Sequence, residues 1–576
     1  MAGSRARCRG TTTCAVSLAR AKTTAGRAGC RVRSTHPPAL NRAPRQRRSC
    51  GRPPLLYAAD VDKFRIALCQ VRAADIEDAE ANLQRLLSAL DGAGAAGAQL
   101  ALLPESSYPA YYLKDSRPYD RPGVRAFGEV RALLAEKARR HGYWLAAGIA
   151  VPTASGGVTN SGLVFSPDGE VRGQYDKSFL WHFDTKWFER GTSFPVFDMG
   201  FCRAGILICA DGRMPEIARA LTLSGAEIIL DLTAWVSSGK DPAGLSNIQY
   251  DYMMPVRAFE NGVWVAAADK WGTEDGSIVY AGRSCLIDPL GVTRVSAPSQ
   301  GDVVVAYDIE PLGVELVPRR PGLYGRLTAP TVSLPVSALL QEPLVPALDN
   351  RRVAVVPGPG MFDARAMIKR YEGLRAQDAD LVVFPGMAAP EGWQVELSTL
   401  EAAVRDLGGM LAFGTSTNGC MWGRSATLVT PGGSLEHVAT HGRGITLGEL
   451  PSPVTASPAG NVALLCGDEA LVPEVARSLT LDGADILVWP VFENHPMNER
   501  LARTRSDENR VYVAAAWDGG GVVTAPNGAV VAASPEGSGV AMTASVNRAM
   551  ARWKDMAPGT HVINDRLPEA YGALTR

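Results

Sequence analysis

Apolar and polar positions alternate over residues 64–71 (FRIALCQV), a pattern that predicts a strand. In the next stretch, IEDAEANLQRLLSALDGAGAAGA, apolar residues recur every three or four positions and glycines follow, which predicts a helix and its end. A strand (LALLPE), a helix (GVRAFGEVRALLAEKARRHG), a strand (YWLAAGIAV) and a hairpin (GLVFSPDGEVRGQYDK) come next. Strands that alternate with helices in this way indicate a layered α/β architecture.

The same order of elements occurs a second time. RRVAVVP, a helix over residues 364–376, DLVVFPG, a further helix, GMLAFGTST and the hairpin SATLVTPGGSLEHV repeat the first series. The segment that starts at Pro215 recurs from Pro473, with ten of sixteen aligned residues identical. Both copies then carry R-x-x-E-N before an apolar strand, starting at Arg257 and at Arg505. Order, type and spacing all recur, so the chain is interpreted as a tandem duplication.

The repeat divides the chain into five predicted segments. Residues 1–60 form a basic arm, 61–315 a first domain, 316–350 a proline-rich linker, 351–555 a second domain and 556–576 a C-terminal tail. The proline-rich stretch is interpreted as a linker or as an extended tail of the first domain.

The formal net charge of zero hides an asymmetry between the arm and the rest of the chain. Residues 1–59 contain thirteen of the 59 basic residues and no acid, so the remainder carries 46 basic and 59 acidic residues. An acidic body argues against a nucleic-acid-binding protein. The arm is interpreted as a disordered extension, or as the result of a start codon assigned too far upstream; its composition also fits an organellar transit peptide. No apolar run approaches eighteen residues, so we expect no membrane partner.

Ten cysteines and seven histidines show no CxxC pair and no metal-ligand spacing. We therefore expect no metal site and no disulfide framework, and a reducing cytoplasm as the location.

Three polar residues each close an apolar strand of the first copy. Cys209 ends GILIC directly before a helix, where a sharp turn exposes the sulfur and backbone N–H groups can receive an oxyanion. Glu105 ends LALLPE, and Lys177 follows the hairpin in GQYDKSFLW. A thiol near its ordinary pKa is mostly protonated at neutral pH, so it needs a base or a positive neighbour. Each residue alone is typical of packing or of a surface charge, but their joint position predicts a cysteine nucleophile that needs no cofactor.

LLPE, YDKSFLW…KWFERG and ICADGRMPEIAR resemble, in this order, the glutamate, lysine and cysteine motifs of the nitrilase, or carbon–nitrogen hydrolase, superfamily. The resemblance covers about residues 64–315 and, more weakly, 352–552. It implies two tandem α/β domains, each an αββα sandwich, that pair as an internal pseudo-dimer. It also implies that Glu105 is the general base, Lys177 the stabiliser of the intermediate and Cys209 the nucleophile. Many members of the superfamily have a second glutamate after the lysine.

Asp184 occupies the place of that second glutamate. Its shorter side chain keeps the charge but reaches less far, so we expect either a further site residue or a structural ion pair.

The substrate class follows from the residues around the cysteine motif. C-A-D-G-R-M-P-E is similar to the amidase and N-carbamoyl-hydrolase branches, whereas nitrilases tend to have Trp-Glu after the cysteine. Gly212 stands where N-carbamoyl-D-amino-acid hydrolases have a carboxylate-binding arginine, which favours a small amide or an N-carbamoyl amine as substrate. We expect hydrolysis through a cysteine thioester with release of ammonia. Acyl transfer to an amine, nitrile hydrolysis and a non-catalytic binding or scaffold role are the alternatives, and a further homo-oligomer stays open.

The second copy lacks the base and the cation. Gly386 replaces the glutamate, and no lysine occurs between Lys369 and Lys554. Cys466 remains, but counting back from the recurring proline gives Gly467, so either one residue has been inserted or the sulfur is displaced. We therefore predict a degenerate second domain that is retained for packing against the first.

Overall fold

The computed structural model describes residues 63–237, 244–310, 312–343, 350–358, 362–389, 392–417, 424–445 and 447–576. The predicted basic arm lies outside these residues. Residues Leu55–Arg576 form one compact unit, which contains both copies of the repeat. We call residues 64–343 the first half and residues 350–576 the second half. Among the described helices, none combines the length and apolar character that spanning a bilayer requires.

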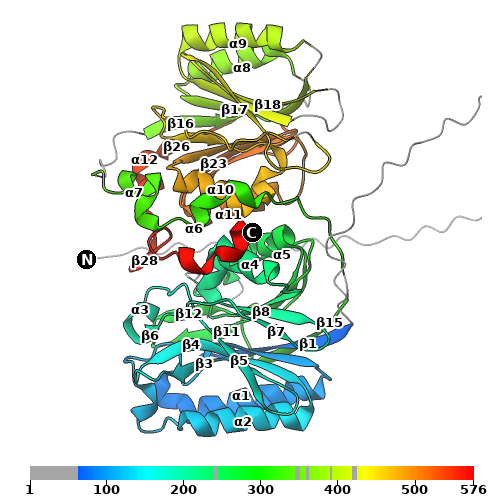
Figure 1. The fold of residues 1–576 in the computed structure, drawn as a ribbon, viewed down its shortest axis with the longest axis vertical. Coiled ribbons are helices and arrows are strands. Elements are labelled where there is room, and N and C mark those ends of the chain that lie inside the picture. Colours follow the sequence, from blue (N-terminus) through cyan, green and yellow to red (C-terminus); the bar gives the residue numbers. More distant parts are fainter. Residues whose placement is uncertain are drawn as a thin grey trace, which may run out of the picture. The chain divides into compact units, whose positions relative to one another are not determined.

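The first half has two sheets in its middle and helices on both outer faces (Figure 1). The first sheet contains β1 (Phe64–Arg72), β2 (Leu100–Tyr108), β3 (Trp144–Pro152), β4 (Val158–Phe165), β5 (Val171–Asp176), β6 (Phe188–Glu189), β11 (Lys270–Glu274), β12 (Ile278–Ala281) and β15 (Val303–Ile309). The second contains β7 (Val196–Asp198), β8 (Arg203–Ile208), β9 (Ile228–Leu232), β10 (Trp264–Ala268), β13 (Cys285–Ile287) and β14 (Thr293–Ser296). Helices α1 (Ala79–Ala95) and α2 (Phe127–His141) cover the first sheet, and α4 (Pro215–Leu223) and α5 (Met254–Asn261) cover the second.

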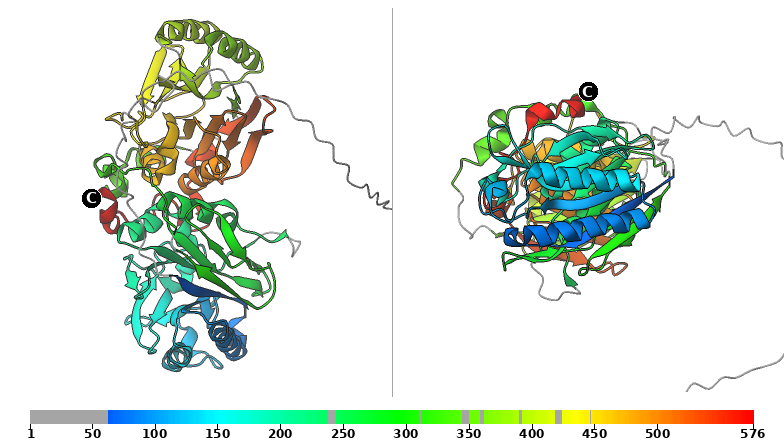
Figure 2. Two further views of the ribbon diagram at one scale, coloured as in Figure 1. Left: turned by 90° about the vertical axis from the view of Figure 1, so that its right-hand side faces the viewer. Right: turned by 90° about the horizontal axis from the view of Figure 1, so that it is seen from below.

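The alternation in β1 reflects two apolar layers, one on each face of its sheet. Ile66 and Leu68 belong to the layer between the two sheets, whereas Ala67 and Cys69 belong to the layer under α1 and α2. Successive side chains of a strand point to opposite faces, so one short apolar run fills both layers. Seen from below in Figure 2, α1 and α2 lie side by side across the outer face of this sheet.

The second half repeats this plan. One sheet contains β16 (Asn350–Val355), β17 (Leu381–Ala389), β18 (Met410–Thr417), β19 (Arg424–Thr430), β20 (Gly433–Val438) and β26 (Met542–Asn547). The other contains β21 (Val462–Leu464), β22 (Ile486–Pro490), β23 (Tyr512–Trp517), β24 (Gly520–Thr524) and β25 (Val530–Ser534). The outer helices are α8 (Ala364–Arg375) and α9 (Gln394–Leu407), and the inner ones are α10 (Pro473–Leu481) and α11 (Asn498–Asn509). Each half is thus an αββα sandwich, as predicted.

The two halves contact each other through the recurring helices α4 and α10. Glu216 on α4 pairs with Arg477 on α10 at 2.7 Å, and Arg219 on α4 pairs with Glu474 on α10 at 3.2 Å. The same motif, P-E-x-A-R, therefore supplies both sides of the contact in reciprocal fashion, which is the signature of a twofold interface. This pairing explains why P-E-x-A-R recurs in a half whose other motifs have changed.

The R-x-x-E-N motifs make a second reciprocal contact. Arg257 pairs with Glu260 of its own helix and with Glu508 of the other half, both at 2.7 Å. Arg505 pairs with Glu508 at 2.5 Å and with Glu260 across the interface. All four side chains are completely buried. Two cations and two anions therefore neutralise each other at the junction between α5 and α11.

The predicted linker and the predicted C-terminal tail share a sequence and a local fold. PGLYGRLT, which starts at Pro321, and PEAYGALT, which starts at Pro568, both form a short 3-10 turn followed by a single helical turn. Arg319 donates to the carbonyl of Leu574, and reciprocally Arg566 donates to the carbonyl of Leu327. Each half thus ends in a C-terminal arm, residues 316–343 in the first half and 556–576 in the second. The two C-terminal arms bind each other through these reciprocal hydrogen bonds. Residues 344–349 of the predicted linker lie outside the described part of the chain.

Candidate active site

Cys209 stands at a sharp turn between β8 and a 3-10 turn (Cys209–Arg213). Its φ angle is 49°, in the left-handed region that side chains other than glycine rarely adopt. Two buried aspartates hold this turn: Asp231 accepts the amide of Cys209 at 3.0 Å, and Asp211 accepts the amide of Ile208 at 3.0 Å. As a whole residue Cys209 is partly exposed, whereas its neighbour Ile208 is buried.

Lys177 and Glu105 lie in direct contact. The Nζ of Lys177 is 2.6 Å from Oε1 of Glu105 and 2.6 Å from Oδ2 of Asp184, and all three side chains are buried. Asn160 donates to the same Oε1 of Glu105 at 2.7 Å. Within the described residues, Oε2 of Glu105 has no hydrogen-bond partner. This oxygen is therefore free to accept a proton.

The charges of Glu105 and Lys177 both act on the thiol of Cys209. Burial raises the pKa of Cys209 well above its usual value, the carboxylate of Glu105 raises it further, and the ammonium of Lys177 lowers it. We call these three predicted residues, which are far apart in sequence, the Glu–Lys–Cys trio: Lys177 contacts Glu105, and both lie close enough to Cys209 to influence its pKa.

The buried carboxylates set the ionisation of the trio. Burial raises the pKa of Glu105, and the bonds from Lys177 and Asn160 only partly offset this. Burial alone would lower the pKa of Lys177, but the carboxylates of Asp184 and Glu105 outweigh it, so that pKa lies well above its usual value. These shifts favour the charged form of Lys177 and the protonated forms of Glu105 and Cys209.

Asp211 links the turn at Cys209 to the loop after Lys177, a role that sequence analysis missed. One of its oxygens accepts the amides of Ser178 at 3.2 Å and Phe179 at 2.8 Å, and the other accepts the hydroxyl of Tyr175 at 2.7 Å. Its place two residues after the cysteine in C-A-D is the only sequence signal for this role. Asn160 and Asp231 were also missed, because nothing near them in the chain indicates that they face the trio.

Gly467, and not Cys466, occupies the nucleophile position of the second half. Gly467 begins the equivalent 3-10 turn with a φ of 56°, and Glu469 accepts the amide of Cys466 as Asp211 accepts that of Ile208. The two turns therefore align without an insertion. The sulfur is displaced by one residue into the core, where the side chain of Cys466 is completely buried.

Small residues replace the other two members of the trio. Glu105 donates its amide to the carbonyl of Thr233, directly after β9, and Gly386 donates its amide to that of Val491, directly after β22. Lys177 and Ala439 likewise donate to the equivalent carbonyls of Asn160 in β4 and Arg424 in β19. A Cβ atom on Gly386 would lie 2.5 Å from the ring of Phe492, which fills the space of the missing carboxylate. The second half keeps the backbone of the site but has glycine, alanine and glycine at the reacting positions.

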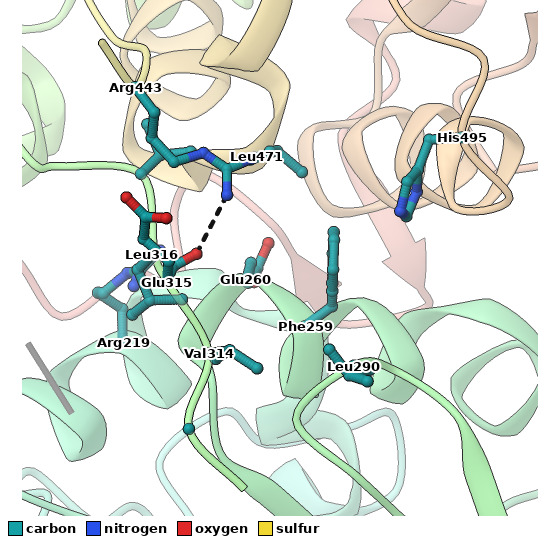
Figure 3. A pocket seen from close by; sticks show the side chains of 12 residues that line it. Arg219, Phe259, Glu260, Leu290, Val314, Glu315, Leu316, Arg443, Leu471 and His495 are labelled. Carbon is teal, nitrogen blue, oxygen red and sulfur yellow. Dashed lines mark hydrogen bonds between the residues drawn. The ribbon is translucent and has the colours of Figure 1, made fainter. Parts of the chain in front are cut away.

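A cavity of about 380 Å³ lies between the two halves, away from the trio (Figure 3). Phe259 and Leu290 of the first half face Leu471 and His495 of the second, and Arg443 donates to a backbone carbonyl at one side. None of the trio lines it. Among the described residues, no group of three or more His, Cys, Asp or Glu side chains is arranged to hold a metal ion.

Two regions of the chain match the profile of one protein family. The profile of the carbon–nitrogen hydrolase family matches residues 65–319 and 352–555. Similar proteins include a nitrilase of Pyrococcus abyssi, 34% identical over 36% of this chain and 76% of its own, and an omega-amidase of Homo sapiens, 28% identical over 43% and 88%. A probable nitrilase of Schizosaccharomyces pombe is 30% identical over 30% of this chain and 64% of its own.

Among solved structures, an amidase from Nesterenkonia sp. is 27% identical over 43% of this chain and 90% of its own, with a TM-score of 0.37. The family profile matches most of the chain in two separate regions, and these regions coincide with the two sandwiches. The chain therefore belongs to the carbon–nitrogen hydrolase family, within the nitrilase superfamily, and carries two tandem domains of that family.

Proposed function

We propose that the first half hydrolyses the C–N bond of a small amide or N-carbamoyl amine and releases ammonia, with Cys209 as nucleophile. The observation that carries this proposal is the buried contact of Lys177 with Glu105 at 2.6 Å beside the thiol, which leaves the second oxygen of Glu105 unpartnered. The relatives named nitrilase and omega-amidase support the same class of bond.

The chemistry begins with a proton transfer. Glu105 takes the thiol proton of Cys209, and the sulfur attacks the carbonyl carbon, so that a C–S bond forms and the carbonyl oxygen becomes an oxyanion. The fixed ammonium of Lys177 stabilises this charge without reorganisation, because two carboxylates already hold it in place. The C–N bond then breaks as Glu105 returns its proton to the leaving nitrogen, and a thioester remains.

Water completes the cycle. Glu105 takes a proton from water, the resulting hydroxide attacks the thioester carbon, and the C–S bond breaks. The proton then moves back from Glu105 to the sulfur of Cys209, and the acid leaves. Atoms balance as amide plus water giving acid plus ammonia, with neither oxidation nor reduction.

The surroundings of Gly212 favour an uncharged substrate. A Cβ atom at this position would lie 2.5 Å from the side chain of Met254 and 3.2 Å from that of Gln249. Gly212 itself has no side chain that could bind a substrate carboxylate. Arg213, the next residue, is already paired with Asp507 of the second half at 3.3 Å and lies over the ring of Trp181.

An ammonia-release screen over small amides, N-carbamoyl amines and nitriles tests the proposal, with Cys209→Ala as the control. We expect ammonia from at least one amide or carbamoyl amine and none from the variant. Adding an amine such as hydroxylamine distinguishes acyl transfer, because a hydroxamate then forms in place of the acid. A wild-type enzyme that binds amides but releases no ammonia would support the non-catalytic alternative and overturn the proposal.

A further inference from the structure

The C-terminal segment of the chain lies against the loop that follows Lys177. We call residues Asp555–Asp565 the brace; it contains the short strands β27 (Asp555–Ala557) and β28 (Thr560–His561). The hydroxyl of Thr560 accepts the amide of His182 at 2.8 Å and lies 3.3 Å from the carbonyl oxygen of Leu180. The brace thus makes polar contacts with the backbone of a loop more than 370 residues earlier in sequence.

The imidazole of His182 makes the third contact. Its Nδ1 lies 3.0 Å from the carbonyl oxygen of Pro558, and a carbonyl only accepts hydrogen bonds, so Nδ1 carries the proton. The φ angle of His182 is 45°, a left-handed conformation that a residue with a side chain holds only when its surroundings fix it. The brace contacts both the amide and the side chain of this residue.

A second link joins the brace to both ends of the loop. Arg190 donates through Nε to the carbonyl of Ser178 at 2.5 Å and through Nη2 to the carbonyl of Asp565. The amide of Gly191 donates to the carbonyl of Lys177 at 2.9 Å and closes the loop at its base. Residues 178–190 are therefore held at their centre and at their ends.

Asp184 connects the loop to the ammonium of Lys177. The amide of Trp181 donates to Oδ2 of Asp184 at 2.9 Å, and the same oxygen lies 2.6 Å from Nζ of Lys177. The path from the brace to the trio is continuous: Thr560 fixes His182, which lies between Trp181 and Asp184, and Asp184 holds Lys177. A shift of about 1 Å in such a path is enough to reduce a rate on the order of a hundredfold.

We propose that the brace is a positioning element for the ammonium of Lys177, so that the first half requires the C-terminal end of the second half for activity. The proposal rests on the function proposed above for the first half. It gives the second half a role that its own missing trio does not supply. It also accounts for a difference between the two C-terminal arms. Among the described residues, the arm of the second half contacts the loop after Lys177, whereas the arm of the first half contacts His441, which follows Ala439 and therefore has no lysine before it.

The arm of the first half provides a matched control. Tyr324 bonds through its hydroxyl to Nε2 of His441 at 2.7 Å, and Arg320 donates to the carbonyl of Thr440 at 3.3 Å. Thr440 follows Ala439, the residue at the lysine position of the second half. Tyr324→Phe therefore removes an arm-to-loop contact of the same kind at a site without a trio.

The decisive variant is Thr560→Val, which removes the hydroxyl but keeps the shape of the side chain. We expect kcat for ammonia release to fall about tenfold, since two hydrogen bonds to the loop are lost. Thr560→Ser recovers the activity, Arg190→Met reproduces the loss through the other link, and Tyr324→Phe leaves kcat unchanged. Circular dichroism and thermal melting establish that each variant is folded.

A second readout needs no substrate turnover. The rate at which iodoacetamide alkylates Cys209, followed by peptide mass spectrometry, rises with pH as the thiolate forms. The Lys177 charge lowers the pKa of this thiol, so a displaced ammonium moves the rise to higher pH in Thr560→Val and Arg190→Met. If no amide is ever hydrolysed, the proposed function fails but these profiles still test the brace. Profiles and kcat equal to wild type in folded Thr560→Val, or an equal loss in Tyr324→Phe, would overturn it.

Discussion

Removing one arginine from the buried four-charge cluster between the halves should destabilise the protein strongly. Arg505→Met deletes the ion pairs to Glu508 at 2.5 Å and to Glu260, and leaves both carboxylates to share Arg257. All four side chains are fully buried, so water cannot replace the lost cation. Breaking a buried pair on one side costs about 3–5 kcal/mol, and we expect the free energy of unfolding to fall by this amount.

The assay is urea unfolding followed by circular dichroism and by tryptophan fluorescence. A free energy is derived only if the two transitions coincide, because a chain with two domains can unfold in steps. Replacing all four charged residues together by methionine or leucine should recover most of the loss, since apolar packing often equals a buried ion cluster. A loss below about 1 kcal/mol for Arg505→Met would refute the view that these charges depend on each other.

Arg257→Met is the matched variant, because the cluster is reciprocal. Arg257 donates through Nε to the carbonyl of Gly212 at 3.0 Å, and Arg505 donates to that of Ala470 at 2.8 Å. Both variants should lose similar stability, but only Gly212 belongs to the turn that starts at Cys209. We therefore expect a lower kcat for folded Arg257→Met than for folded Arg505→Met. Equal activity in the two would show that the cluster does not influence the turn.

Two further predictions concern ionisation and the second cysteine. Asn160→Leu removes the 2.7 Å hydrogen bond that lowers the pKa of Glu105, so this pKa rises further. Because Glu105 must be ionised to accept the thiol proton, the acid limb of the pH profile of kcat/KM should move up by about one pH unit. An unmoved acid limb would exclude Glu105 as the titrating base. Cys466→Ala should leave ammonia release unchanged while Cys209→Ala abolishes it, because Cys466 is fully buried and has no lysine beside it. Loss of activity in folded Cys466→Ala would contradict the assignment of Gly467 to the nucleophile position.

The sequence alone determined the duplication and the layered α/β plan, and it selected the three residues of the trio as candidates; the αββα order was implied by the resemblance to the family. These features depend on local patterns, because the period of apolar residues selects helix or strand. Lys177 and Cys209 directly follow β5 and β8, whereas Glu105 lies within β2, where the register of its pairing with β3 shifts. The recurring P-E-x-A-R and R-x-x-E-N motifs likewise showed that both copies retain these charged residues. They did not show which partner each charge has.

Only the tertiary structure decided how these parts act on one another. It assigned the nucleophile position of the second half to Gly467, because the φ angle and the turn, not the identity of the nearest cysteine, define that place. It also showed that Asp231 accepts a hydrogen bond from the amide of Cys209 and that Thr560 accepts one from the amide of His182. Each of these contacts joins residues that are distant in the chain and carry no local signal, since a hydrogen bond across the fold depends on how whole sheets and arms are placed.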